Sequence, residues 1–404
     1  MAEKTFTWKA DYMESSSCHN TGFASYAQDL YWNHPLDYYF NTSVGVGTTD
    51  LGTYRKKYRT TLYGFPVLAF HQKSDGTSEF IGQYNFNLDK SAPTTLGMEL
   101  DIEHPYLPGQ KIADVCECWE FANNMGGRCS FRGNPFDYEY NYDEEKYNLY
   151  DADGNLIEGE GKSDIGDDLE VRYHKDKDAI EGAFDNLDAP KDDGGKPLAG
   201  GSKEAFEILI GQKDETTGMR TGAYRHLEVL FDWLKDCYYA FDLNTAEDRE
   251  WVAELLGRES VTYSDLYNEN GTVKDSEYSA LLAARKQKFG TEFDKHLNLE
   301  YCLIYYIMTE LLLQYDSRGK NMMLSSWGPV ENGGHYIWFP IYYDIDTQLG
   351  VNNSGVPSWE YNVEPTTGFN NPGGGKAFST ANSLLWNNFH KYFVEESSVV
   401  RNRY

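Results

Sequence analysis

The chain has 404 residues, with 36 Lys plus Arg against 64 Asp plus Glu, so its formal net charge is −28. Such an acidic chain is unsuited to general nucleic-acid binding, because phosphate contacts need Lys and Arg. It is equally unsuited to docking on anionic lipid, which recruits basic segments. At roughly 100–200 residues per domain, the length allows one large domain with insertions or a few smaller ones.

The apolar residues are unusual in kind, because the chain contains 32 Tyr, 21 Phe and 9 Trp. Tyr, Trp and Phe are enriched in the cores of protein–protein interfaces. The composition therefore leaves two interpretations open. One is a set of large aromatic contact surfaces, and the other is a Tyr-rich core with Tyr-rich loops.

The cysteines are spread widely along the chain, at Cys18, Cys116, Cys118, Cys129, Cys237 and Cys302. This spacing does not indicate a disulfide scaffold. Cys116 and Cys118, with Cys129 farther along, could suggest a metal site. Only one residue separates Cys116 from Cys118, whereas zinc ligands usually have two to four residues between them, and no fourth ligand stands nearby, so we expect no zinc site there. With no signal peptide at the N-terminus, we expect a soluble protein made in a reducing cytoplasm. The longest apolar stretch, residues 297–313, is too short and too polar to span a bilayer.

The first 137 residues have the pattern of a β-rich lobe. Residues 5–12 alternate in type and favour a strand. Residues 62–71 and 80–88 predict two more strands, and the sequence Ser-Asp-Gly-Thr at positions 74–77 between them is typical of a hairpin turn. Further strands are predicted at residues 98–102 and 113–121.

Residues 138–203 change in character, because Tyr, Asp, Glu and Gly dominate this segment. They predict an acidic insertion or connection between two lobes. Residues 151–155 look like the opening of a calcium-binding EF-hand loop. The twelfth position of that loop is Lys162, where a bidentate Glu is required, so we expect a hairpin turn rather than a calcium site.

Residues 204–404 predict a helical lobe that contains a small hairpin. Helical patterns recur at residues 203–210, 224–241, 245–256, 276–289 and 380–393. In residues 293–315 the apolar positions cover most of the helix circumference, which predicts a buried central helix. Short strands are predicted at residues 321–325 and 335–343. The order of elements as a whole predicts a two-lobed α+β fold.

One group of polar residues follows the predicted central helix. Asp316 and Asn321 are five positions apart in a loop, and the second strand of the hairpin leads into Asp344 and Asp346. This is the spacing of a protein-kinase catalytic loop, where the Asp orients a hydroxyl and the Asn holds a metal. Carboxylate and amide oxygens are ligands that Mg²⁺ prefers. The alternative is that Asp316 and Asn321 cap the loop and the other two Asp begin a turn.

In the order of these parts the chain resembles the CotH family of kinase-fold spore-coat proteins, in the diverged form found in virion proteins of crAss-like tailed phages. The matching parts are, in chain order, residues 8–12 with Lys9, the hairpin at residues 63–86, the predicted central helix, the Asp316–Asn321 loop, and Asp344 with Asp346. The resemblance covers most of the chain outside residues 138–203.

The resemblance implies a protein-kinase-like fold with a β-rich N-terminal lobe and a helical C-terminal lobe. Lys9 would hold nucleotide phosphates, and Asp316 would be the catalytic carboxylate. Asn321, Asp344 and Asp346 would hold the metal, so an intact site would use Mg²⁺ and ATP. Only eight residues precede Lys9 and none is Gly, whereas a kinase places its Gly-rich loop before this Lys. Either the chain lacks the nucleotide lid, or it is one piece of a longer polypeptide.

These features lead to two main expectations of function. The first is a structural component of a bacteriophage virion, in the tail or tail tip, assembled in the host cytoplasm from other virion proteins and copies of itself. Its acidic surface would let DNA slide past without sequence-specific contacts. The second is an active atypical kinase that transfers phosphate from Mg-ATP. A binding module such as a surface adhesin is the remaining alternative.

Overall fold

The structure is a computed structural model. It describes residues 6–10, 19–33, 61–62, 64–90, 96, 98–99, 101, 103–121, 139–141, 146–148, 169–187, 207–212, 214–237, 241, 243–312, 314, 322–344, 349 and 384–397. The chain folds as two compact units, and each unit is built from three chain segments. The first contains Met1–Gly127, Asp167–Asp178 and Asp294–Ser383, and the second contains Arg128–Gly166, Ala179–Phe293 and Leu384–Tyr404.

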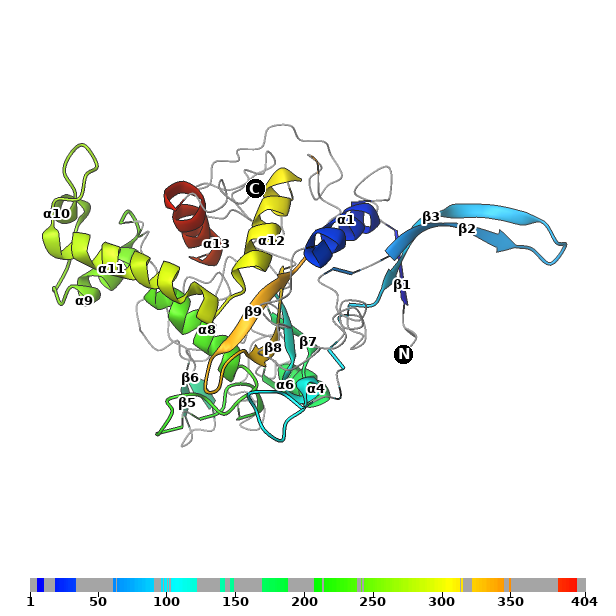
Figure 1. Ribbon diagram of the computed structural model, residues 1–404, viewed down its shortest axis with the longest axis horizontal. Coiled ribbons are helices and arrows are strands. Elements are labelled where there is room, and N and C mark those ends of the chain that lie inside the picture. Colours follow the sequence, from blue (N-terminus) through cyan, green and yellow to red (C-terminus); the bar gives the residue numbers. More distant parts are fainter. Residues whose placement is uncertain are drawn as a thin grey trace, which may run out of the picture. The chain divides into compact units, whose positions relative to one another are not determined.

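The first unit begins with a three-stranded antiparallel sheet (Figure 1). Its strands are β1 (Phe6–Lys9), β2 (Gly64–Gln72) and β3 (Ser78–Leu88), in the order β1-β3-β2. The turn between β2 and β3 has the predicted chemistry, because Asp75 accepts hydrogen bonds from the backbone and hydroxyl of Thr77. Gly76 takes the left-handed conformation with a φ of 86°. The predicted hairpin is therefore confirmed.

A helix that the sequence did not predict, α1 (His19–Asn33), packs against β2 and β3. Its apolar and polar residues do not separate into one clear stripe, so periodicity gave no signal for it. The small side chains of Ala24 and Ala27 are buried and the hydroxyl of Thr61 donates to Gln28. Contact with the sheet therefore stabilises this helix more than its own pattern does.

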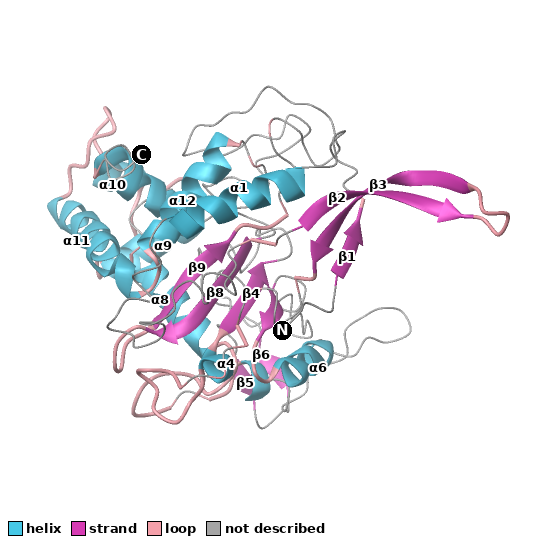
Figure 2. Cartoon of the chain, turned by 45° about the vertical axis from the view of Figure 1, so that its right-hand side comes forward, coloured by secondary structure: helices cyan, strands magenta, loops and turns pink. Residues whose placement is uncertain are grey.

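A second antiparallel sheet forms the core of the first unit (Figure 2). It contains β4 (Glu117–Phe121), β7 (Leu169–Tyr173), β8 (Met322–Pro329) and β9 (Tyr336–Ile341), in the order β7-β4-β8-β9. All residues of β4, β8 and β9 are buried. Strands that are far apart in the sequence thus complete one sheet.

Two predicted elements of this unit are shorter than expected. The strand predicted at residues 113–121 begins only at Glu117, because the short helix α4 (Ile112–Val115) precedes it. The helix predicted at residues 293–315 is α12 (Leu299–Leu311), preceded by a 3-10 turn at Phe293–Lys295. Asn298 caps α12 by accepting from the backbone N–H of Tyr301 at 3.1 Å, which sets the start of the helix. Residues 98, 99 and 101 are not in a strand, contrary to the prediction at 98–102.

The second unit is mainly helical. Its elements are the hairpin β5 (Glu139–Asn141) and β6 (Lys146–Asn148), and the helices α8 (Arg225–Asp236), α9 (Ala246–Leu255), α10 (Tyr263–Leu266), α11 (Ser276–Glu292) and α13 (Leu384–Phe389). A π-helix, His390–Glu396, continues α13. Helix α6 (Lys177–Leu187) begins in the first unit and continues into the second. The predicted helices at 224–241, 245–256 and 276–289 are confirmed by α8, α9 and α11.

The described residues have the mixed α+β fold that the sequence predicts, with antiparallel sheets near the N-terminus and a more helical C-terminal region. The domain boundaries predicted after residues 137 and 203 lie outside the described residues and stay predictions. A kinase-like architecture also stays a proposal. Across the described ranges, no helix combines the length and the apolar character needed to cross a membrane.

Candidate functional site

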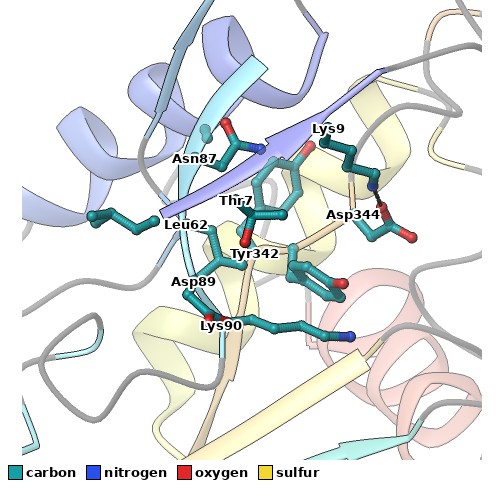
Figure 3. Close-up of a pocket in the computed structure, with 11 residues that line it drawn as sticks. Thr7, Lys9, Leu62, Asn87, Asp89, Lys90, Tyr342 and Asp344 are labelled. Carbon is teal, nitrogen blue, oxygen red and sulfur yellow. Dashed lines mark hydrogen bonds and ion pairs between the residues drawn. The ribbon is translucent and has the colours of Figure 1, made fainter. Parts of the chain in front are cut away.

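The structure brings together two of the residues that the sequence analysis singled out. Lys9, the last residue of β1, donates a hydrogen bond from its ammonium group to the carboxylate of Asp344, three residues after β9. The two residues are 335 positions apart in the sequence. Figure 3 shows their side chains pointing toward each other. The predicted phosphate-binding lysine and one predicted metal ligand therefore form an ion pair.

Asp344 is held in place by an unusual backbone conformation and by Gln314. Its φ is 51°, in the left-handed region that Asp tolerates better than most residues. The buried side chain of Gln314 lies 3.5 Å from the backbone oxygen of Tyr343 and 3.4 Å from that of Asp344, close enough to donate to both. A residue other than glycine in the left-handed region costs free energy, and such residues are concentrated at functional sites. The end of α12 thus positions the carboxylate of Asp344.

The ion pair borders a pocket in the first unit with a volume of about 190 Å³. The pocket is lined by Thr7, Lys9, Ala24, Leu62, Asn87, Leu88, Asp89, Lys90 and the segment 342–344. Two lysines and two aspartates balance each other in this lining. An anion without a bound cation therefore gains little electrostatic attraction from the pocket lining. A ligand that carries its own cation would leave the net charge of the pocket balanced.

A second group of charges connects this pocket to the core sheet. The ammonium group of Lys90 lies 3.1 and 3.0 Å from the two carboxylate oxygens of Glu120. Arg172 of β7 also donates to Glu120 from its Nε, and it donates to Glu170 from its Nη2. Glu120 is only 2% exposed. Burial by itself lowers the pKa of Arg172, but the nearby negative charges, Glu120 first and then Glu170, together outweigh this effect and raise the pKa overall.

Tyr343 packs between the Lys9–Asp344 ion pair and the charged group of Lys90, Glu120 and Arg172. The ammonium group of Lys90 lies 4.9 Å from the centre of its ring, at the distance of a cation–π contact. Burial raises the pKa of the Tyr343 hydroxyl far above its usual range, and the nearby carboxylate of Asp344 adds to the effect. Tyr343 therefore stays neutral at physiological pH and cannot serve as a general base there.

Three other predicted site residues, Asp316, Asn321 and Asp346, lie outside the described residues, so their roles stay predictions. In the part of the chain that is described, no group of three His, Cys, Asp or Glu side chains could hold a metal ion. Sequence reasoning missed the contribution of Lys90 and Glu120. The available signal was that the short strand β4 carries two Glu, Glu117 and Glu120, among apolar residues, because a buried carboxylate needs a partner.

The four cysteines that the structure describes are free and buried: Cys116, Cys118, Cys237 and Cys302. Burial raises the pKa of Cys118 and of Cys237 to about 12. It also raises the pKa of the other two thiols well above the usual value. Because the thiolate is the reactive form, these four side chains are unsuited to nucleophilic or redox chemistry.

We expect the folded protein to resist alkylation at these cysteines. A pKa raised from 9.0 to about 12 reduces the thiolate fraction of Cys118 and Cys237 by about a thousand-fold at neutral pH. Iodoacetamide labelling followed by peptide mass spectrometry would measure this site by site. The guanidinium-unfolded chain is the control and should be labelled fully. Native labelling of Cys118 or Cys237 at the unfolded rate would contradict the burial described here.

A scan against models of protein families found no match to the chain, and a search of curated proteins found none either. The resemblance to CotH-like proteins rests on the order of sequence elements and on the residues that they carry.

Proposed function

We propose that this protein is a structural component of a bacteriophage virion, in the tail or tail tip, where a CotH-like kinase-type fold serves as an assembly scaffold. The observation that carries the proposal is the gathering of exposed apolar side chains on the sheet β1-β3-β2. Seven of the twelve large apolar side chains that are exposed in the described residues lie there: Phe6, Trp8, Phe65, Leu68, Phe70, Phe80 and Ile81.

These side chains form two patches, which the register of the strands defines. At the base of the hairpin, Phe6, Trp8 and Phe65 surround Phe86, with ring centroids 4.6, 6.0 and 5.5 Å from it. We call this group the base patch. Farther along the hairpin a β-bulge between Ala69 and Phe70 shifts the register. The tip patch lies around this bulge and is made of Leu68, Phe70, Phe80 and Ile81.

Each patch exposes much apolar surface. In the base patch Phe6, Trp8 and Phe65 are 42%, 60% and 48% exposed, and in the tip patch Phe70 and Phe80 are 57% and 56% exposed. At about 200 Å² for each aromatic side chain, these rings present about 300 Å² in the base patch and about 230 Å² in the tip patch. The base patch alone reaches the size of the largest apolar patch on a typical monomer, and such patches are often functional. Contact with neighbouring subunits is the function that this surface supports best.

The test is the composition of purified particles. Gradient-purified particles from host cells that produce this chain should contain it at a fixed ratio to the other virion proteins, measured by quantitative mass spectrometry. An unrelated cytoplasmic host protein serves as the control for carry-over. A chain that is a stable monomer and is absent from every particle would rule out the structural role.

A second candidate function, an atypical kinase, is favoured by one observation, the Lys9–Asp344 ion pair beside a pocket. A carboxylate and a lysine in one pocket fit the chemistry of a metal–nucleotide complex. Asp344 would hold the metal and Lys9 would contact the phosphates, while Gln314 keeps the backbone of Asp344 in place. Bound Mg²⁺ would supply neutralisation of phosphate charge, and the chain would contribute mainly positioning.

We expect Mg-ATP to stabilise the protein if this second function is present. At a concentration 100 times the Kd, binding adds about 2.7 kcal/mol to the free energy of unfolding, which a thermal shift assay detects. Lys9→Met and Asp344→Asn should abolish the shift, and labelled-phosphate transfer should also vanish in Asp316→Ala. The variant Asp101→Asn is a matched control, since it removes one exposed carboxylate outside the pocket. A wild-type protein without any shift would eliminate the kinase.

A further inference from the structure

We propose that the outer part of the β2–β3 hairpin, residues 68–81, is an arm that docks into an apolar groove bordered by Lys and Arg side chains on a different protein chain. The inference rests on the proposed assembly function and names the partner chemistry for one of its surfaces. The arm carries the tip patch of Leu68, Phe70, Phe80 and Ile81.

The pairing of the strands makes this segment an arm. β1 pairs with β3 only from Asn85 to Leu88, so in the described residues the outer part of β3 pairs with β2 alone. The arm is therefore a two-stranded ribbon, and it extends away from β1 and α1 in both views (Figure 1 and Figure 2). A two-stranded ribbon is only marginally stable in water without packing against another element.

Three members of the tip patch, Leu68, Phe70 and Phe80, share one face of this ribbon, and Ile81 lies at the bulge. Leu68 and Phe70 are two positions apart on β2, so their side chains point to the same face. Phe70 pairs across the strands with Phe80, and their ring centroids are 5.4 Å apart. Nothing in the described residues covers these side chains, which are all more than half exposed. A partner that covers the patch would supply the packing that the ribbon needs.

A second copy of this chain is a poor receptor for the arm. In the base patch the rings of Phe6, Trp8 and Phe65 already pack around Phe86. Apart from that patch, the other exposed large apolar side chains of the described residues are scattered over separate elements: Tyr26, Leu255, Tyr263, Leu311 and Leu349. They form no surface that matches the tip patch. Two copies would also each carry a net charge of −28, and like charge opposes their approach.

The charge of the chain favours a basic border around the receiving groove. From Gly64 to Leu88 the ionised side chains are Lys73, Asp75 and Glu79, so the hairpin carries +1 − 2 = −1. A nearly neutral apolar arm on a strongly acidic chain fits a groove with an apolar floor and Lys or Arg at its edge. Interface cores are depleted in charge, whereas charged residues at the rim steer association.

The experiment is crosslinking inside the particle. A photo-reactive phenylalanine analogue replaces Phe70 in the full chain, particles are purified and irradiated, and crosslinked peptides are identified by mass spectrometry. We expect crosslinks to apolar residues of a different virion chain, with Lys or Arg close to each site. The same analogue at Tyr263, an exposed aromatic position of α10, is the matched control and should give none of these crosslinks.

The possible outcomes separate the two proposals. A chain that is absent from particles overturns the assembly function and the arm with it. A chain that is present but crosslinks at position 70 to its own copies, to lipid or to nothing overturns the arm alone. A groove without basic residues would also overturn it.

Two further measurements do not depend on crosslinking. The double variant Phe70→Ser/Phe80→Ser should enter particles at least about ten-fold less than the wild type, while Tyr263→Ser should enter normally. Thermal melts must show that both variants fold. The purified wild type should sediment as a monomer in both about 0.01 M and about 1 M salt, where the Debye length falls from about 30 to about 3 Å. A dimer that the double variant loses would overturn the choice of a different partner.

Discussion

Replacing Glu120 with alanine should lower the free energy of unfolding by about 3–5 kcal/mol. Glu120 is buried in β4 and accepts hydrogen bonds from both Lys90 and Arg172. Its removal leaves the guanidinium of Arg172, which is itself buried, with the half-exposed Glu170 as its one carboxylate partner among the described residues. Breaking a buried ion pair on one side is costly because the remaining charge loses its compensation. Guanidinium unfolding of the wild type and variant measures the difference.

The matched control is Glu170→Ala. Glu170 contacts the same arginine, but its side chain is 43% exposed, so water can replace it and the cost should stay below about 1 kcal/mol. In the Arg172→Met background, Glu120→Ala should lower the free energy of unfolding by less than it does in the wild type, because the guanidinium charge that Glu120 compensates is absent. If Glu120→Ala and Glu170→Ala proved equally mild, Glu120 would not be holding a buried charge.

Gly290→Ala should destabilise the second unit by about 1–3 kcal/mol, although Gly to Ala inside a helix normally stabilises by about 1 kcal/mol. Gly290 lies within α11, and a Cβ atom there would be 1.9 Å from Cζ and 2.0 Å from the hydroxyl oxygen of Tyr392. The ring of Tyr392 cannot move away freely, since it packs against Phe289 and Phe393 with centroid distances of 6.1 and 4.9 Å.

A double-mutant cycle tests this close approach. In the Tyr392→Ala background Gly290→Ala should become stabilising, because the clash is gone and only the helix propensity remains. Gly182→Ala is the matched control, as it lies in helix α6 with nothing within 4 Å of the added Cβ. Thermal melts of the wild type, the two single variants, the double variant and the Gly182→Ala control measure the changes in stability. A stabilising Gly290→Ala in the wild-type background would show that the packing around Tyr392 is looser than described.

Local chemistry explains which elements could be predicted. The β2–β3 hairpin follows from the turn sequence at residues 74–77, and α9 follows from Thr245, whose hydroxyl accepts from the backbone of Asp248. Helix α1 was missed because its stability comes from contact with a sheet that is distant in the sequence. The strand predicted at residues 113–121 was too long because α4 occupies its first residues. The apolar residues of this segment alone could not distinguish a helix from a strand.

The candidate site was predictable only in part. Asp344 could be selected from the sequence because it follows a short strand after a loop with kinase-like spacing, and Lys9 could be selected only through the family resemblance. The contact between Lys9 and Asp344 could not be predicted, because no local pattern links residues that are 335 positions apart. Lys90 and Glu120 were also not anticipated. Their roles depend on the burial of β4, which is complete only when β7 and β8 flank it.

By itself the sequence determined the net charge of −28, the mixed α+β character and the positions of most hairpins and helices, because these depend on composition and local periodicity. It left open whether the many aromatic residues form the core or contact surfaces. The tertiary structure decided this residue by residue. Trp119, Trp327, Trp338 and Trp386 are fully buried, whereas Trp8 and several Phe of the hairpin are exposed. The physical reason is that burial depends on which elements pack together, and distant segments of the chain settle that packing.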